Sequence, residues 1–259
     1  MHRSVILTYH SLDDSGSRMS VRPPDFERQV DWIGRSGRTF TNVSSLIDGT
    51  APPGAVALTF DDGISSVMDV ALPLLACRDL RATIFPISSR LSMRTRWQDG
   101  SGALPSFRTV SEEDLRTLAS RGWEIGSHTV DHACLVGADP AEIVASLIRS
   151  QRDLELMTGT RVRGLAYPNG CNSAHVRRAV ESAGFDWALG TVPGPLSPKF
   201  DRFDIHRVNI GATTSPARFR AAFVPLIQAA RRIPFHPRGR SDGHTHPLTN
   251  VTSEFEPCT

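Results

Sequence analysis

The chain has 259 residues and a formal net charge of +2, with 29 lysines and arginines against 27 aspartates and glutamates. This length suits a single α/β-barrel domain, and the near balance of charge, with no basic stretch interleaved with aromatic residues, argues against a nucleic-acid partner. No run of roughly eighteen apolar residues is present, so the sequence predicts no transmembrane segment.

Strands and helices alternate along most of the chain, which predicts parallel β/α units. The expected helices carry start and stop signals and apolar residues at helical spacing, which we expect to face the core. In chain order, the expected elements are a strand at 5–9, a helix from residue 23, a strand at 57–60, a helix at 67–75 with a kink or break at Pro73, a strand at 82–85, a helix from residue 111, a strand at 123–126, a helix at 139–158, a strand at 165–167, a helix at 174–183, strands at 187–189 and 205–210, and a helix at 216–232.

The most informative stretch is the end of the strand at 57–60, where an apolar run meets Asp61, Asp62 and Gly63. Buried strands do not tolerate charge unless it is paired or ligates a metal, and Gly63 allows a sharp turn. An ordinary surface turn is the plain alternative. Successive side chains in a strand point to opposite faces, so we expect the two aspartates to have different tasks.

A second motif places His128 and His132 after the short strand at 123–126. Histidines four apart lie on one face of a helical turn, near enough to bind one cation, although a solvated surface pair has the same spacing. Two imidazoles and one carboxylate leave a position open for water, which is the arrangement of a catalytic zinc site.

A third motif, Pro168-Asn169-Gly170, interrupts the strand at 165–167. Pro-Asn-Gly is a strong turn signal, and a plain turn explains it. The functional interpretation is that this turn aims a backbone N–H into a site.

In this order, the three motifs resemble the polysaccharide deacetylase family, also called the NodB-homology or carbohydrate esterase family 4 domain. Thr59–Gly63 matches the first family motif and His128–His132 the second, while Glu124–Thr129 and Ala82–Phe85 are typical of the strands beside them. The resemblance extends over roughly residues 3–210. It implies a distorted (β/α) barrel of the NodB-homology type, with residues 1–233 as a single catalytic domain.

The resemblance also implies a role for each motif residue in hydrolysing an N-acetylated sugar to a free amine and acetate. Asp62, His128 and His132 would hold a divalent metal, most simply Zn²⁺, with Co²⁺, Ni²⁺ and Mn²⁺ as alternatives. Asp61 would be the general base that activates the attacking water. The backbone N–H of Asn169 would stabilise the oxyanion together with the metal.

The general acid has two candidates, His10 and His206. The opening strand ends in Tyr9-His10, which resembles the rearranged family branch typified by biofilm poly-N-acetylglucosamine deacetylases, where such a histidine supplies the acid. We favour His10, because it terminates a strand while His206 lies within one. Many family members carry an arginine in place of Ala166 to orient the base, and we expect Arg207 to replace it as the partner of Asp61. An unrelated salt bridge of Arg207 is the alternative.

Two other functions are compatible with the same scaffold. One is hydrolysis of a non-sugar amide or imide, as in metal-independent relatives, and the other is carbohydrate binding by an inactive relative. Such proteins typically lose a metal ligand or one of the paired aspartates. This chain keeps them, which favours the deacetylase.

Residues 1–4 lead directly into the first strand, which leaves no room for a secretory signal. We therefore expect a cytoplasmic chain that acts on a smaller substrate, such as a sugar nucleotide, a lipid-linked sugar or a glycosylated metabolite. A chain trimmed of an export signal would look the same and would be extracellular. Nothing in the sequence indicates an oligomeric state.

Several remaining features have no assigned role. Residues 88–110, with Trp97 and Phe107, are either a loop that stacks a sugar ring over the site or a surface excursion. Residues 234–259 are expected to form a flexible tail, including a His-Thr-His sequence at 244–246. The four cysteines lack paired spacing, so we expect free thiols; they are Cys77, Cys134, Cys171 and Cys258.

Overall fold

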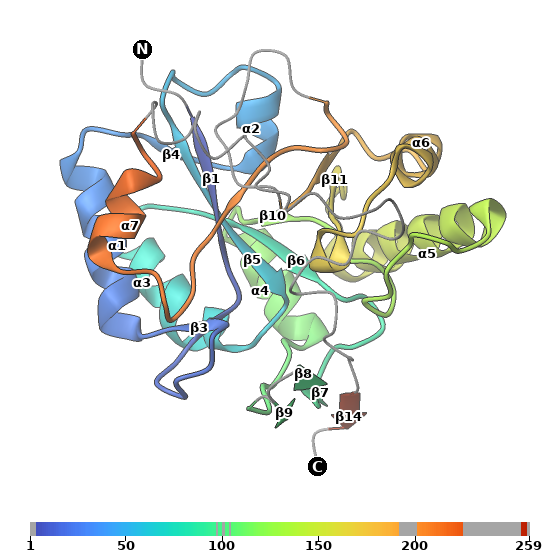
Figure 1. Ribbon diagram of the computed structural model, residues 1–259, viewed down its shortest axis with the longest axis horizontal. Coiled ribbons are helices and arrows are strands. Elements are labelled where there is room, and N and C mark those ends of the chain that lie inside the picture. The colour runs from blue at the N-terminus through green and yellow to red at the C-terminus, as the bar shows by residue number, and fades with distance from the viewer. Residues whose placement is uncertain are drawn as a thin grey trace, which may run out of the picture.

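A parallel sheet runs through the centre of the protein in the strand order β10–β6–β5–β1–β13 (Figure 1). The computed structural model describes residues 4–96, 98–99, 102–103, 105–191, 201–224 and 255–257. The five strands are β1 (Val5–Tyr9), β5 (Val56–Asp62), β6 (Thr83–Pro86), β10 (Glu124–Ile125) and β13 (Val208–Asn209). Every residue of β1 and β5 is buried, as expected for central parallel strands with both faces covered.

The sheet closes into an irregular ring. The strands β11 (Gly164–Ala166) and β12 (Trp187–Leu189) pair in parallel with each other. Isolated parallel bridges, Ser127 to Leu165 and Leu189 to Ile205, connect them to the segments that continue β10 and precede β13. The path therefore returns to β1 as a distorted barrel of parallel strands.

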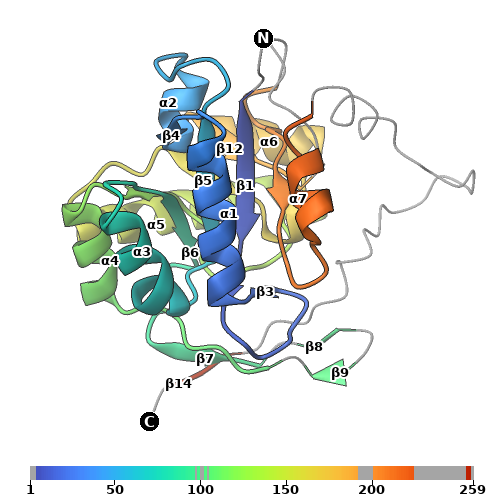
Figure 2. The same cartoon turned by 90° about the vertical axis from the view of Figure 1, so that its left-hand side faces the viewer.

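Helices cover the outside of the barrel strands (Figures 1 and 2). They are α1 (Pro23–Arg35), α2 (Val43–Ile47), a π-helix (Val67–Ala71) that continues into α3 (Leu72–Ala76), α4 (Glu112–Ser120), α5 (Pro140–Thr158), α6 (Ala174–Ser182) and α7 (Pro216–Ala221), with a short 3-10 turn at Pro168–Gly170. None of the helices within the described ranges combines the length and apolar character needed to cross a bilayer.

The apolar faces of the helices pack against the strands as predicted. In α1 the side chains of Phe26, Val30 and Ile33 are buried. Phe26 meets Tyr9 of β1 and Phe60 of β5, with ring centroids 5.1 and 5.9 Å apart. Burying one such large side chain stabilises the fold by about 1.5–3 kcal/mol, so these contacts fix α1 against the two central strands.

Two of the longer helices begin at the predicted caps. Ser111 and Asp114 form a reciprocal capping box at the start of α4, and the Asp139 side chain accepts hydrogen bonds from the first turn of α5. Each satisfies backbone N–H groups that the helix leaves unpaired. Gly159 ends α5 in the left-handed conformation that glycine adopts without strain.

Three elements differ from the sequence prediction. The break at 67–75 falls at the π-to-α junction before Leu72, one residue earlier than the predicted Pro73, which lies in the first turn of α3. The strand expected at 205–210 is reduced to β13, since the chain shifts from bridging β12 at Ile205 to pairing with β1. The helix expected at 216–232 is observed as α7, which ends at Ala221, where the chain turns and Phe223 packs on Trp32 of α1; residues 225–232 lie outside the described residues.

A sixth short strand, β4 (Phe40–Thr41), pairs in parallel with the start of β5 and belongs to the central sheet. Other short strands lie outside this sheet. They are β2 (Ser11–Leu12), β3 (Ser20–Val21), β7 (Met93–Thr95), β8 (Gln98–Asp99), β9 (Gly102–Ala103) and β14 (Phe255–Pro257). β14 pairs antiparallel with β7, so the expected flexible tail is wrong for these three residues. The rest of 234–259, with the His-Thr-His sequence and Cys258, lies outside the described residues. Cys77, Cys134 and Cys171 are free thiols, as expected.

Candidate active site

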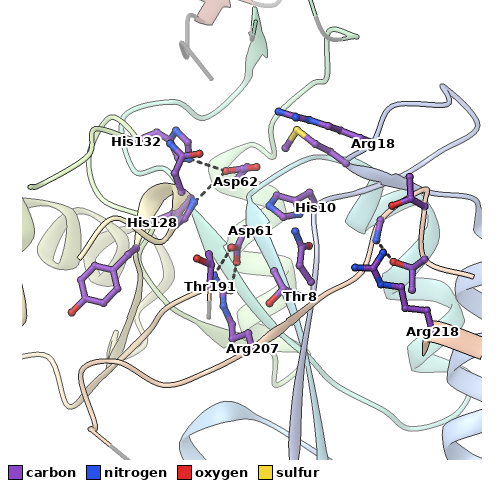
Figure 3. Close-up of a pocket in the computed structure, with 17 residues that line it drawn as sticks. Thr8, His10, Arg18, Asp61, Asp62, His128, His132, Thr191, Arg207 and Arg218 are labelled. Atoms are coloured by element: carbon purple, nitrogen blue, oxygen red, sulfur yellow. Dashed lines mark hydrogen bonds and ion pairs between the residues drawn. The ribbon is translucent and has the colours of Figure 1, made fainter. Parts of the chain in front are cut away.

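The sequence motifs converge at the carboxyl ends of the barrel strands. His10 directly follows β1, Asp61 and Asp62 end β5, and the loops after β10 and β11 carry His128 and Asn169. Parallel strands of a closed barrel share one carboxyl edge, which brings these distant segments together. The side chains line one pocket of about 300 Å³ (Figure 3), a size typical of a small-molecule site.

Asp62, His128 and His132 form a buried group with the spacing of metal ligands. Their ligand atoms all lie within 4.8 Å of one another. The Nε2 atoms of His128 and His132 are 3.2 and 3.4 Å from Asp62 Oδ1. Donor atoms that share a tetrahedral zinc at ordinary bond lengths lie about 3.3 Å apart, so these separations fit a single cation.

The hydrogen bonds around these three side chains leave metal-binding atoms of His128 and Asp62 available to a cation. His128 Nδ1 lies 2.8 Å from the carbonyl oxygen of Ala166. That bond fixes the proton on Nδ1 and leaves the Nε2 lone pair available to a metal. Asp62 Oδ1 is buried and accepts no hydrogen bond, and a buried carboxylate oxygen without a partner is costly. A cation held by the three side chains would satisfy it.

The loop with the two histidines is not the helical turn that we expected. Thr129 and His132 have φ values of 67° and 66°, in the left-handed region, and Asp62 and Asn169 share this feature with φ values of 66° and 53°. This conformation is unfavourable for residues other than glycine. Four residues with this conformation lie around one pocket, which indicates that function constrains the backbone there.

A chain of buried hydroxyl groups supports the histidine loop. The Ser150 hydroxyl on α5 lies 2.6 Å from that of Ser127. The Ser127 hydroxyl accepts a hydrogen bond from the backbone N–H of Thr129, and the Thr129 hydroxyl accepts one from the N–H of His132. The sequence analysis placed Ser127 and Thr129 within the second motif without a supporting role, and it missed Ser150, because a small polar residue on a long helix carries no motif of its own.

Asp61 is paired with Arg207. The guanidinium donates two hydrogen bonds to the two carboxylate oxygens, at 2.7 and 2.8 Å. Both side chains are almost fully buried, and Arg207 Nε also donates to the carbonyl oxygen of Gly190 at 3.1 Å. Arg207 thus contacts the expected base from the residue that precedes β13, whereas Ala166 offers only its backbone to the site.

The two neighbouring aspartates do not point to opposite faces as the strand pattern predicts. Both line the same pocket, because the left-handed conformation of Asp62 ends the regular alternation of the strand. They nevertheless have different partners. Asp61 faces the guanidinium of Arg207, while Asp62 faces the two imidazoles, so the two carboxylates have different electrostatic surroundings.

The charges around the pocket keep both carboxylates ionised. Burial alone would raise the pKa of Asp61, but the positive charge of Arg207 outweighs it and holds that pKa below its usual value. For Asp62, the surrounding histidines outweigh burial and hold the pKa far below its usual value. Burial lowers the pKa of His132 to about 4, which leaves a neutral imidazole. Burial acts in the same direction on His128, but the carboxylates raise its pKa overall, so a proton would compete with a metal there.

The remaining predicted residues occupy different positions relative to the pocket. His10 is half-buried and lines it, and Figure 3 places its ring beside both aspartates. Asn169 also lines it, from the 3-10 turn after β11. His206 belongs to the described residues but is not part of the lining. Phe107 is buried away from this pocket, so it does not stack a sugar there, and Trp97 lies outside the described residues.

Other residues of the lining carry no recognisable motif. They come from β1, the loop before β3, the loop after β12, β13 and α7, and include Thr8, Arg18, Thr191, Asn209 and Arg218. Some of these residues could have been predicted from their position, because they lie at or just beyond the end of a barrel strand. Arg18 and Arg218 have no such position in the sequence pattern.

We predict that zinc stabilises the native protein through this group. At a free concentration of about 100 times the dissociation constant, zinc should add about 2.7 kcal/mol to the free energy of unfolding. The measurement is the Tm of metal-free protein titrated with zinc. His128→Ala should lose the shift, while His175→Ala, an exposed position on α6, should retain it. An equal shift in His128→Ala would place the bound zinc elsewhere.

A family model and individual relatives of known sequence place this chain in the same protein family. Residues 48–188 match the polysaccharide deacetylase family, a span that is more than half of the chain and contains β5, both histidines and the turn at Asn169. The chain is 28% identical over 231 residues to the YxkH protein of Bacillus subtilis, covering 87% of this chain and 76% of that protein. It is 26% identical over 202 residues to the poly-beta-1,6-N-acetyl-D-glucosamine N-deacetylase of Staphylococcus epidermidis, covering 73% and 67%.

Solved structures share the fold at low sequence identity. The Streptococcus pyogenes deacetylase PplD, solved in complex with acetate, superposes with a TM-score of 0.74 at 21% identity, covering 86% of this chain and 99% of that chain. IcaB from Ammonifex degensii gives a TM-score of 0.71 at 23% identity, covering 86% and 98%. The predicted distorted (β/α) barrel is therefore confirmed. The chain belongs to the polysaccharide deacetylase family, the NodB-homology or carbohydrate esterase family 4 domain.

Proposed function

We propose that this protein is a metal-dependent N-deacetylase that hydrolyses the acetamide of an N-acetylated sugar to a free amine and acetate. The observation that carries this proposal is the meeting of a buried Asp–His–His group with the Asp61–Arg207 pair and His10 in one pocket. The relative from Staphylococcus epidermidis bears the name of an N-deacetylase acting on a polymer of N-acetyl-D-glucosamine, which supports this choice of substrate class.

Zinc is the metal that we propose for Asp62, His128 and His132, because two imidazoles and one carboxylate form a common catalytic zinc ligand set. A divalent metal held there would lower the pKa of a bound water and polarise the acetyl carbonyl. Co²⁺, Ni²⁺ and Mn²⁺ accept the same nitrogen and oxygen ligands and are alternatives. The buried, unpartnered oxygen of Asp62 fits this role.

The protein side chains supply the proton transfers. Asp61, kept ionised by Arg207, accepts a proton from the attacking water as its oxygen bonds to the acetyl carbon. The carbonyl oxygen then carries negative charge, which the backbone N–H of Asn169 helps to stabilise. When the C–N bond breaks, His10 donates a proton to the departing nitrogen. The products are acetate and the free amine of the sugar.

Acetate release tests the proposal directly. The purified protein, loaded with zinc, is incubated with N-acetylated sugar nucleotides, sugar phosphates and short N-acetylglucosamine oligomers, and acetate is measured by a coupled assay. We expect release from at least one of them, loss on metal removal and recovery with zinc. Amide hydrolysis without metal would favour the metal-independent activity, and sugar binding with no hydrolysis would favour an inactive binding relative.

The choice between the two candidate acids has its own test. His10→Ala should reduce kcat by about a hundredfold or more, the usual effect of removing a general acid. His206→Ala is the matched control, since His206 is outside the pocket lining, and should retain most of the activity. Rates are compared on the substrate that gives the highest acetate release. A larger loss in His206→Ala than in His10→Ala would reverse the assignment.

Replacing Arg207 should change the pH dependence. Without its charge, burial raises the Asp61 pKa, so in Arg207→Ala the acidic limb of the pH–rate profile should move to higher pH. Because pairing lowers the Asp61 pKa in the folded state, its contribution to stability is present above the ordinary aspartate pKa and declines as pH falls through the folded value. Removing one partner of a buried pair should also lower the free energy of unfolding by about 3–5 kcal/mol.

Arg207→Lys is the control for this experiment, because it keeps the charge but not the two-pronged contact. Its acidic limb should move less than that of Arg207→Ala. Denaturant unfolding at neutral pH checks that each variant is folded before its profile is recorded. An acidic limb that stays in place in Arg207→Ala would show that Arg207 does not maintain the charge of Asp61.

A further inference from the structure

The pocket lining carries two arginines that the proposed deacetylation chemistry does not use. Arg18 from the loop between β2 and β3 and Arg218 from α7 both line the pocket that contains the metal group. In Figure 3 Arg218 lies on the far side of His10 from His128, and the side chain of Arg18 passes above His10.

The negative charges of the pocket are already engaged. The lining includes three arginines and two aspartates, and Asp61 is occupied by Arg207. Asp62 faces the two histidines and would share its charge with a bound cation. Among the described residues, no carboxylate forms an ion pair with Arg218. A divalent metal in the site would add further positive charge to the pocket.

The backbone that carries Arg218 is firmly placed. Ser215 caps α7 by accepting a hydrogen bond from the backbone N–H of Arg218 at 3.2 Å. The next residue, Phe219, is buried and packs against Trp32 of α1 with ring centroids 5.8 Å apart. The exposed guanidinium of Arg218 therefore projects into the pocket from an anchored segment. The polar residues Asn209 and Thr213 also line the pocket.

We propose that Arg218, together with Arg18, binds a phosphate group attached to the N-acetylated sugar, so that the substrate is a sugar phosphate or a nucleotide-linked sugar. This inference rests on the proposed deacetylase function and names its substrate class. Guanidinium groups bind phosphate through paired, charge-assisted hydrogen bonds. A partly deacetylated polymer is the opposite case, because its free amines are cationic and the arginines would repel them.

The test compares three substrates with the zinc-loaded enzyme: N-acetylglucosamine 1-phosphate, UDP-N-acetylglucosamine and neutral N,N′-diacetylchitobiose. We expect kcat/KM to be about tenfold or more higher for a phosphate-bearing substrate, the usual effect of a charge-assisted hydrogen bond. Arg218→Gln should lower the ratio of phosphate-bearing to neutral kcat/KM by about tenfold, mainly through KM. Arg220→Gln, an exposed position on the same helix outside the pocket lining, is the matched control and should leave the ratio unchanged.

The two phosphate-bearing substrates distinguish the sources of the group. A preference for the monoester indicates a sugar phosphate, and a preference for the diphosphate indicates a nucleotide-linked sugar. Raising the ionic strength should reduce the preference, because exposed charges are screened. Equal kcat/KM for neutral and phosphate-bearing substrates, with no effect of Arg218→Gln on their ratio, would overturn the inference and leave the deacetylase function standing.

A binding measurement separates this inference from the proposed function. Calorimetry on metal-free protein compares N-acetylglucosamine 1-phosphate with N-acetylglucosamine, so neither hydrolysis nor a metal–phosphate contact contributes. Tighter binding of the phosphate that weakens about tenfold in Arg218→Gln supports the anion site, even if no acetate is ever released. Equal binding of the two sugars would contradict it, whatever the outcome of the acetate assay.

Discussion

Two adjacent carboxylates are buried at the end of β5, and the pocket is organised around the need to compensate both charges. An uncompensated charge in a protein interior is strongly destabilising. Arg207 meets Asp61 with two hydrogen bonds, while Asp62 faces His128 and His132. These partners are far apart in the sequence. Only the closed ring of parallel strands places the loop after β10 and the start of β13 beside the end of β5.

The backbone around the pocket is held in conformations that the chain would not adopt alone. Asp62, Thr129, His132 and Asn169 all have positive φ values, and each such residue carries a local energetic penalty of about 1–3 kcal/mol. The buried hydroxyl chain from Ser150 and the surrounding strands oppose that penalty. The result is a site whose donor atoms are already near their working positions, which is what preorganised catalysis requires.

Strong local patterns were sufficient to predict the fold class, the family and the convergence of Asp61, Asp62, His128 and His132. The strand ends were visible because an apolar run stopped at charge or at a turn signal. Features set by tertiary contacts were not visible. After α7 the chain turns and Phe223 packs on Trp32, and both aspartates enter one pocket because of a single left-handed residue. Arg18 and Arg218 lie outside every motif, and only folding brings them to the same pocket.

The group of Asp62, His128 and His132 and the side chain of Arg218 lie on opposite sides of His10 in the pocket. The proposed chemistry depends on Asp62, His128 and His132 sharing one cation. X-ray absorption spectroscopy of the zinc-loaded protein measures this most directly. We predict a zinc with oxygen and nitrogen ligands that include two imidazoles, reduced to one imidazole in His132→Ala. Zinc bound through cysteine sulfur, or a spectrum unchanged in His132→Ala, would contradict the proposed centre.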